Sequence, residues 1–207
     1  MSYSEPARTR ASRARSTVLV ALIVISAAVI GVLVFQSVTP SSSASPPGML
    51  GHHHGARGKS AGAVPDGVTV FDDEYAAVSH LDSDLLDAVR EAAMDAADDG
   101  VQLFVNSGWR SEEYQARLFQ EALEEHGSEE EAARWVSSPE TSRHVSGDAI
   151  DLGPPVSTPW LAEHGAAYGL CQIYDNEPWH YELRSEAMAH GCPATYPDPT
   201  HDPRMQR

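Results

Sequence analysis

An uncharged apolar run near the N-terminus divides the chain into parts with different roles. Residues 18–38 read VLVALIVISAAVIGVLVFQSV and contain no charged side chain. At 1.5 Å of rise per residue, a helix of roughly 20 residues crosses the ~30 Å hydrocarbon core of a bilayer. Four arginines lie just before this run, and positive charge favours the cytoplasmic side of a membrane. The sequence therefore predicts a cytoplasmic basic tail at residues 1–17 and a transmembrane anchor at residues 18–38.

A cleaved secretory signal is the alternative interpretation of this run. The apolar region of such a signal normally spans about 7–15 residues and precedes a small-residue cleavage site. The run here is longer, and Ser43-Ala44-Ser45 is a poor cleavage site some distance downstream. The sequence thus favours an uncleaved, single-pass anchor in the cell membrane. Both interpretations place the rest of the chain outside the cytoplasm.

The segment after the apolar run has the composition of a flexible tether. Residues 39–65 are rich in Ser, Pro and Gly, and such a composition cannot bury a core. We therefore predict a linker at residues 39–65 and one folded, extracytoplasmic domain at residues 66–207. A hydrophobic content of 42% is adequate for a core in a domain of this size.

The charge of the exported part argues against nucleic acid as a partner. The whole chain has a formal net charge of −16. Residues 1–16 hold four arginines against one glutamate, so the rest of the chain carries −19. An acidic domain of this kind repels phosphate backbones.

The pattern of apolar residues and turn signals after residue 66 predicts an α+β domain. Helices precede most of the strands, and the connections are short, which is typical of a small antiparallel sheet with flanking helices. Asp82 or Ser83 caps the first predicted helix, Ser111 the second, and Ser128 with Glu131 a third. The predicted helices are residues 82–99, 111–125, 128–135 and 158–165 or 158–169, and the predicted strands are residues 101–107, 149–152, 170–173 and 179–183.

The chain has two cysteines, Cys171 and Cys192. Two cysteines in an exported domain pair more often than not, and such a bond could stabilise the fold by ~3 kcal/mol. Two separate buried thiols remain the alternative. Neither cysteine has another at metal-ligand spacing, so neither is predicted to bind zinc.

The unusual polar residues gather in three short segments: SGWRS at 107–111, SRHVSGDAID at 142–151 and EPWH at 177–180. Zinc hydrolases commonly use three N or O ligands and leave one position for water. Gly147 permits a tight turn between His144 and Asp151, so that a loop presents the first and a strand the second. Asp151 lies beside apolar residues and needs a partner there, which a zinc ion would supply. His180 is the candidate third ligand.

Two further residues suit the chemistry of a zinc hydrolase. Glu177 lies three residues before His180, and residues three apart in a strand face opposite ways, so both reach one site only if Pro178 introduces a bend. Glu177 would then take a proton from zinc-bound water and pass it to the leaving amine. Arg110 follows a predicted strand and is a candidate to stabilise an oxyanion or to grip a substrate carboxylate.

The motifs SGWRS, S-x-H-x-x-G-x-A-x-D and E-x-W-H, in this order, resemble those of the VanY/VanX-like zinc D-alanyl-D-alanine carboxypeptidases. These are related to lysostaphin-type peptidases and to hedgehog domains. The resemblance covers roughly residues 80–185 and implies removal of the terminal D-alanine from peptidoglycan stem peptides. It implies that His144, Asp151 and His180 bind Zn2+, that Glu177 and Arg110 are catalytic, and that Ser142 and Gln115 help to hold the substrate.

One departure from the resemblance concerns the pocket. Many relatives have a longer segment before E-x-W-H that forms part of the pocket wall, whereas residues 174–177 here run almost straight into it. A shorter wall predicts a more open cleft. L,D-carboxypeptidase and endopeptidase activities therefore stay open beside the D,D-carboxypeptidase, as does a non-catalytic wall-binding module with a structural zinc.

Overall fold

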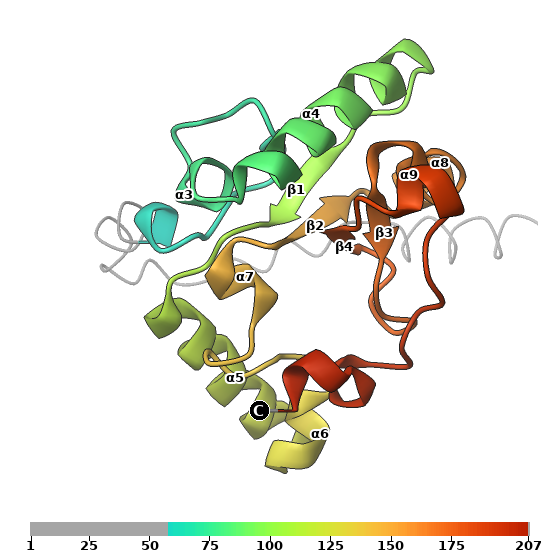
Figure 1. Ribbon diagram of the computed structural model, residues 1–207. Helices are drawn as coiled ribbons and strands as arrows, with labels where there is room; N and C mark the ends of the chain where they lie inside the picture. Colours follow the sequence, from blue (N-terminus) through green and yellow to red (C-terminus); the bar gives the residue numbers. More distant parts are fainter. Residues whose placement is uncertain (1–57, 207) are drawn as a thin grey trace, which may run out of the picture. The chain divides into compact units, whose positions relative to one another are not determined.

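The computed structural model describes residues 58–206, which form an α+β fold around one four-stranded sheet (Figure 1). Among these residues, no helix is both long and apolar enough to cross a membrane. The predicted basic tail and anchor at residues 1–38 lie outside the described residues, as does most of the predicted linker. The α+β prediction, with a small antiparallel sheet, is confirmed.

The sheet is antiparallel throughout, with the strand order β1-β2-β4-β3. Its central strands are β2 and β4, and Asp151 of β2 lies opposite His180 of β4. On the other side of β2, Ser107 of β1 lies opposite the same aspartate. The strand bounds are β1 Phe104–Ser107, β2 Ala149–Gly153, β3 Leu170–Gln172 and β4 His180–Leu183, each within or close to a predicted strand.

The two faces of the sheet differ in polarity because side chains alternate along each strand. Ile150 and Leu152 of β2 and Tyr181 of β4 belong to the main apolar core. Asp151 and His180 lie at the alternate positions and therefore face the other side. Helix α4, Ser83–Asp98, covers the apolar face with a buried row of Leu85, Val89, Ala92, Ala93 and Ala96 (Figure 1).

The helix caps explain where the main helices start and end. The Asp82 carboxylate accepts hydrogen bonds from the first-turn N–H groups of α4, and Ser111 and Ser128 do the same for α5 and α6. These are the predicted caps. Gly127 ends α5 in the left-handed conformation, which favours glycine. The bounds are α5 Glu112–His126 and α6 Glu129–Ala133.

Shorter elements complete the fold. They include the one-turn helix α7, Arg143–Ser146, which leads into β2. The others are α3 Ala76–Ser79, α8 Thr158–His164, α9 Ala187–His190, and the 3-10 helices η1 Pro155–Ser157, η2 Gly165–Tyr168, η3 Pro199–His201 and η4 Pro203–Met205. Figure 1 shows α5, α6 and the C-terminal 3-10 helices on the side of the sheet opposite α4. The polar face of the sheet therefore looks toward α5, α6 and the C-terminal segment.

The folded region starts N-terminal to the predicted boundary at residue 66. Ala61 is half-buried, and its carbonyl accepts a hydrogen bond from the N–H of Ser111 at 2.9 Å. Val64 packs against the main core. Residues 58–65 therefore belong to the fold rather than to a tether. Their composition did not indicate this, because their few apolar side chains pack against a surface formed by distant residues.

A disulfide joins Cys171 of β3 to Cys192, so the predicted pairing is confirmed. The bond ties the chain that follows α9 to the edge strand of the sheet. The residues beyond it return across the fold, where Tyr196 bridges to Tyr174.

Candidate metal centre and active site

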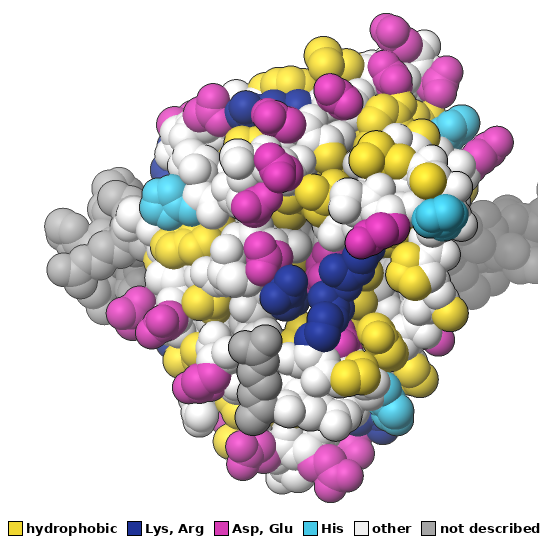
Figure 2. All heavy atoms as spheres, in the orientation of Figure 1, with side chains coloured by type: hydrophobic (Ala, Val, Ile, Leu, Met, Phe, Trp, Pro, Cys, Tyr) yellow, Lys and Arg dark blue, Asp and Glu magenta, His cyan; other side chains and the backbone are white. Residues whose placement is uncertain are grey.

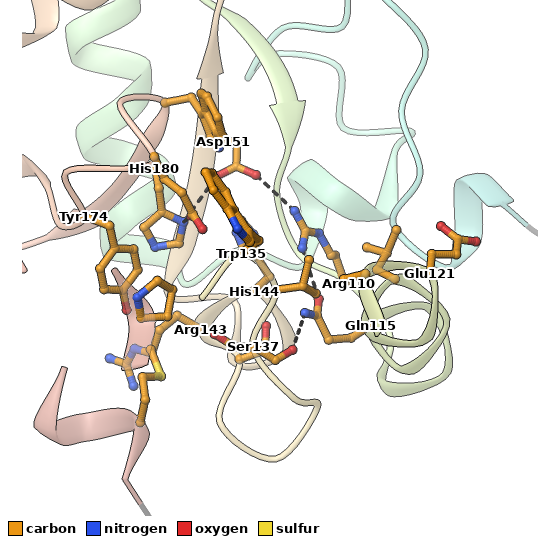
Figure 3. Close-up of a pocket in the computed structure, with 18 of the residues that line it drawn as sticks. Arg110, Gln115, Glu121, Trp135, Ser137, Arg143, His144, Asp151, Tyr174 and His180 are labelled. Carbon is orange, nitrogen blue, oxygen red and sulfur yellow. Dashed lines mark hydrogen bonds and ion pairs between the residues drawn. The ribbon is translucent and has the colours of Figure 1, made fainter. Parts of the chain in front are cut away.

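Three buried side chains, His144, Asp151 and His180, converge on one point at the polar face of the sheet (Figure 3). Each offers one ligand atom, and these atoms lie within 4.8 Å of one another. The Asp151 Oδ1 lies 3.4 Å from His144 Nε2 and 3.2 Å from His180 Nδ1. The three predicted ligands are thus brought together in space.

The backbone explains this convergence. The pairing of β2 with β4 places Asp151 and His180 side by side. His144 lies on helix α7, whereas the sequence predicted a loop here. Gly147 ends this helix at φ +82°, and a Cβ there would lie 2.7 Å from the carbonyl oxygen of His80. Glycine is therefore needed both for the turn and for the close approach.

The surroundings of the two imidazoles leave one nitrogen of each facing the aspartate. His144 Nδ1 lies 2.8 Å from the carbonyl oxygen of Gly108, which can only accept, so Nδ1 carries the proton and Nε2 has the free lone pair. The Nε2 of His180 points toward Glu182, with 3.5 Å to Oε1, which leaves Nδ1 toward Asp151. Two imidazole nitrogens and one carboxylate oxygen, all from buried side chains, form a donor set that fits a zinc ion.

Burial and charge act differently on the three groups when no metal is bound. Burial and the Arg110 guanidinium lower the pKa of His144. Burial also opposes protonation of His180, but contacts with Asp151 and Glu182 outweigh it and raise the pKa to about 9. Burial raises the pKa of Asp151, yet the two histidines and Arg110 hold it well below its usual range. A cation at this point would replace the proton on His180.

Glu177 lies beside the three convergent groups. The N–H of His180 donates to the carbonyl of Glu177 at 3.0 Å, closing a turn at Pro178 just before β4. The predicted bend is therefore present. The carboxylate is buried, and its Oε2 lies 3.6 Å from His180 Nδ1. Burial raises the pKa of Glu177 to about 7; His180 opposes this rise and the Asp151 charge adds to it.

Arg110 reaches the same group from the turn after β1 (Figure 3). Its guanidinium donates to Asp151 Oδ2 at 3.0 Å and to Ser107 Oγ at 2.7 Å. A third hydrogen bond, at 3.1 Å, goes to the side-chain oxygen of Gln115, whose amide nitrogen donates to the Ser137 carbonyl at 2.8 Å. Gln115 is buried, and its polar atoms hold Arg110 in place. Gln115 also lines the cavity, so the substrate contact that the resemblance implies for it stays a prediction.

Ser142 lines the same cavity just before α7. Its side chain is 5% exposed, and its Oγ has no hydrogen-bond partner among the described residues. A buried hydroxyl without a partner is uncommon. This atom is therefore available to a ligand, as the predicted substrate-binding role requires.

The metal-ligand group opens into a cavity of about 620 Å³. Helix α5 lines one side, and the exposed rings of Trp135 and Trp179 lie on its lining. Pro199 and Met205 of the C-terminal segment also contribute to the wall. No local signal in the sequence indicates that this segment folds back to the cavity.

Comparison with known proteins adds a family assignment. The sequence pattern of the family VanY, described as D-alanyl-D-alanine carboxypeptidase, matches residues 78–185, just over half of the chain. The matched region contains all three convergent side chains, Glu177 and Arg110. The chain belongs to the VanY family.

Individual relatives agree with this assignment to the VanY family. A D-alanyl-D-alanine carboxypeptidase of Enterococcus faecalis (strain ATCC 700802 / V583) is 32% identical over 124 residues. The match covers 47% of this chain and 43% of that protein, so it spans less than half of the curated relative.

Two solved structures are also similar. The LdcB LD-carboxypeptidase has a TM-score of 0.50 and 22% identity, covering 62% of this chain and 71% of its own, and shows the shared fold. A mutant of the vancomycin-resistance D,D-pentapeptidase VanY, in complex with Zn(II), has a TM-score of 0.47 and 27% identity. That match covers 50% of this chain and 72% of the other.

Sequence reasoning missed one buried group in this VanY-family site. Glu182 is 1% exposed and contacts His180, Arg184 and Arg204. Burial raises its pKa, but His180 and Arg204 outweigh this and lower it to about 2. Alternation along β4 could have placed Glu182 on the same face as His180. No local signal could have identified Arg204, which comes from the end of the described chain.

Proposed function

We propose that this chain is a zinc-dependent D-alanyl-D-alanine carboxypeptidase that removes the C-terminal D-alanine from peptidoglycan stem peptides. One observation carries the proposal. The ligand atoms of three buried side chains lie within 4.8 Å of one another in the region that matches the VanY family, and Glu177 and Arg110 contact that group. A structural zinc would normally have four protein ligands, whereas three leave a position for water.

The residues His144, Asp151 and His180 would hold the zinc ion. When bound, zinc lowers the pKa of a water ligand to about 7 and polarises a carbonyl group. Asp151 would bind through Oδ1, because its Oδ2 accepts a hydrogen bond from the Arg110 guanidinium. The carbonyl of Gly108 keeps the His144 ring in an orientation in which Nε2 would be available to the ion.

Glu177 is the proposed general base and later the general acid. Its carboxylate is buried at the cavity wall and lies within 3.6 Å of a ligand nitrogen, so it borders the position that water would take. It accepts the proton of the attacking water and delivers it to the departing amine of D-alanine.

Arg110 and Ser142 are proposed to act on the peptide itself. Arg110 borders the cavity as a fixed positive charge, and it would stabilise the oxyanion that forms when water attacks the scissile carbonyl. Its fixed position depends on Gln115 and Ser107. The unpartnered Oγ of Ser142 would donate to the carboxylate of the terminal D-alanine.

The site of action is proposed to be the outer face of the cell membrane. The apolar run at residues 18–38 would anchor the chain as a single span with its N-terminus in the cytoplasm, so that the peptidase domain meets its polymer substrate. Sequencing the N-terminus of the mature protein tests this. A start at or near residue 1 in the membrane fraction supports the anchor, and a start after residue 40 in the soluble fraction contradicts it.

Mass spectrometry of muropeptides tests the proposed reaction. The full chain, in detergent with zinc, is incubated with a stem pentapeptide, a tetrapeptide and a cross-linked dimer. The proposal predicts loss of one alanine from the pentapeptide, abolished by a chelator and restored by zinc. Shortening of the tetrapeptide alone would instead indicate an L,D-carboxypeptidase, and conversion of dimers to monomers an endopeptidase. An unchanged mixture in the presence of bound zinc would contradict all three.

A further inference from the structure

A buried carboxylate lies behind the candidate metal ligand His180. Glu182 is two residues further along β4, so the two side chains lie on the same face of the sheet. The Glu182 Oε1 is 3.5 Å from His180 Nε2, the ring nitrogen that faces away from Asp151. That nitrogen is buried and has no hydrogen-bond partner of ordinary geometry among the described residues.

A metal ion at Nδ1 would force the remaining ring proton onto Nε2. A buried N–H group needs an acceptor, and Glu182 is the carboxylate that faces this one. In metal sites the second nitrogen of a histidine ligand usually donates to a carboxylate or a carbonyl, which fixes the tautomer and the ring orientation. The Gly108 carbonyl is this acceptor for His144, and the Glu182 carboxylate is placed to be the acceptor for His180.

Glu182 is held in turn by arginines. Its Oε2 accepts hydrogen bonds from Arg204 at 2.6 Å and from Arg184 at 2.8 Å, and the Arg143 Nε lies 3.8 Å away. These contacts leave Oε1 directed toward the histidine, with a weaker contact to Arg204 at 3.3 Å. Figure 2 shows Lys and Arg side chains gathered near the middle of this face, although the chain as a whole is strongly acidic.

The C-terminal segment, residues 192–206, delivers Arg204 to this cluster. The family match ends at residue 185, so the segment lies beyond it. Its start is fixed by the disulfide at Cys192, and its middle by an ion pair between Asp198 and Arg134 at 3.0 Å. Asp202 accepts hydrogen bonds from Arg204 and from the hydroxyl of Tyr174, whose ring lies 5.1 Å from that of His180.

We propose that Glu182 and Arg204 are positioning residues for the metal ligand His180, so that the C-terminal segment is part of the metal site. The inference rests on the proposed function, since it takes His180 to be a zinc ligand. Arg204 keeps the Glu182 carboxylate aimed at Nε2, and Glu182 keeps the ring oriented with Nδ1 toward the ion. The alternative is that the pair only attaches the segment to the sheet.

Matched substitutions in the full chain separate these two roles. Arg204→Gln and Arg134→Gln each remove one guanidinium from a contact between the C-terminal segment and the rest of the fold. Within the part of the chain that the structure describes, the Arg134 side chain pairs with Asp198 and Glu131 and not with Glu182 or His180, so it is the control. Glu182→Gln keeps the shape of the side chain and removes its charge. Arg204→Lys keeps the positive charge and tests for rescue.

Three readouts are needed: thermal unfolding, zinc affinity by competition with a chelator, and the visible spectrum of the cobalt-substituted protein. We expect Glu182→Gln and Arg204→Gln to weaken zinc binding by about 10-fold or more and to shift the cobalt spectrum. Arg134→Gln should lower the unfolding temperature while changing zinc affinity by less than about twofold. Arg204→Lys should recover part of the affinity.

The outcomes distinguish this inference from the proposed function. If the unsubstituted chain binds zinc and hydrolyses the pentapeptide while Arg204→Gln and Glu182→Gln keep its zinc affinity and cobalt spectrum, the positioning role is wrong and the pair is only structural. If Glu182→Gln does not fold, the comparison of Arg204→Gln with Arg134→Gln decides, and equal zinc affinities overturn the inference. If the unsubstituted chain binds no zinc, both this inference and the proposed function fail.

Discussion

Replacing Gly147 by alanine is a sharp test of how the fold positions His144. Gly147 adopts φ +82°, where a residue with a Cβ costs roughly 1–2 kcal/mol. The added Cβ would also lie 2.7 Å from the carbonyl oxygen of His80 and 3.2 Å from the N–H nitrogen of Asp82. Both contacts are with backbone, so helix α7 has to move. Overpacking of this kind typically costs about 1–3 kcal/mol more.

Gly127 provides the matched control. It ends α5 at φ +78°, and a Cβ there would meet nothing within 4 Å. Gly127→Ala therefore incurs only the conformational cost of roughly 1–2 kcal/mol, against about 2–5 kcal/mol for Gly147→Ala. Both substitutions reduce the entropy of the unfolded chain similarly, so that contribution cancels in the comparison.

The assay is urea unfolding of both variants, followed by zinc titration of the folded protein. We expect Gly147→Ala to be the less stable variant and the only one with weakened zinc binding, because α7 carries His144. Equal stability losses for the two variants, or unchanged zinc affinity in Gly147→Ala, would refute the argument that the close approach to His80 fixes this ligand.

Three further predictions address the chemistry and the stability of the fold. Glu177→Gln should bind zinc within about twofold of the unsubstituted chain while kcat for D-alanine release falls by roughly 10²–10⁴; full turnover would exclude Glu177 as the base. The pKa of His180 is about 9 without metal, so zinc must displace its proton below that pH, and apparent zinc affinity should rise about tenfold per unit between pH 6 and 8. A pH-independent affinity in a competition titration would contradict this. Replacing both Cys171 and Cys192 by serine should lower the free energy of unfolding in urea by about 3 kcal/mol, and an unaltered urea midpoint would show that the disulfide adds no stability.

The elements were predictable where local signals set their ends. The caps Asp82, Ser111 and Ser128 are short-range features, since each oxygen binds an N–H two or three residues away. The helices that start at these caps therefore lie within a few residues of their predicted bounds. The same holds for strand β2, whose apolar residues alternate. The one-turn helix α7 had no such signal. Ser142, at its start, makes no capping hydrogen bond.

Long-range contacts account for what the sequence did not indicate. The three polar segments taken together suggested that His144, Asp151 and His180 meet, with Gly147 as a turn between the first two, and the family resemblance implied the same three ligands. In contrast, the partner of Glu182 is Arg204, 22 residues away, and it is brought back by a return of the chain that no local pattern encodes. The packing of residues 58–65 on the fold is the same kind of case.

The exposure of Gln115 shows a related limit. On a helix rich in charged residues, a glutamine is commonly solvent-exposed, yet Gln115 is 1% exposed. Its burial follows from the position of α5 against residues 137 and 110, which sets both of its hydrogen bonds. The family resemblance indicated a functional role for Gln115, whereas its burial and its hydrogen bonds are apparent only in the fold.

The proposed enzymatic activity depends most directly on where a zinc ion binds. A crystal structure of the full chain with zinc, with the metal located by anomalous scattering at the zinc edge, tests it. We predict one ion bound by His144 Nε2, Asp151 Oδ1 and His180 Nδ1 at about 2.0–2.2 Å, with the fourth position open to solvent. An ion bound elsewhere on the chain, or one held there by four protein ligands, would contradict the account.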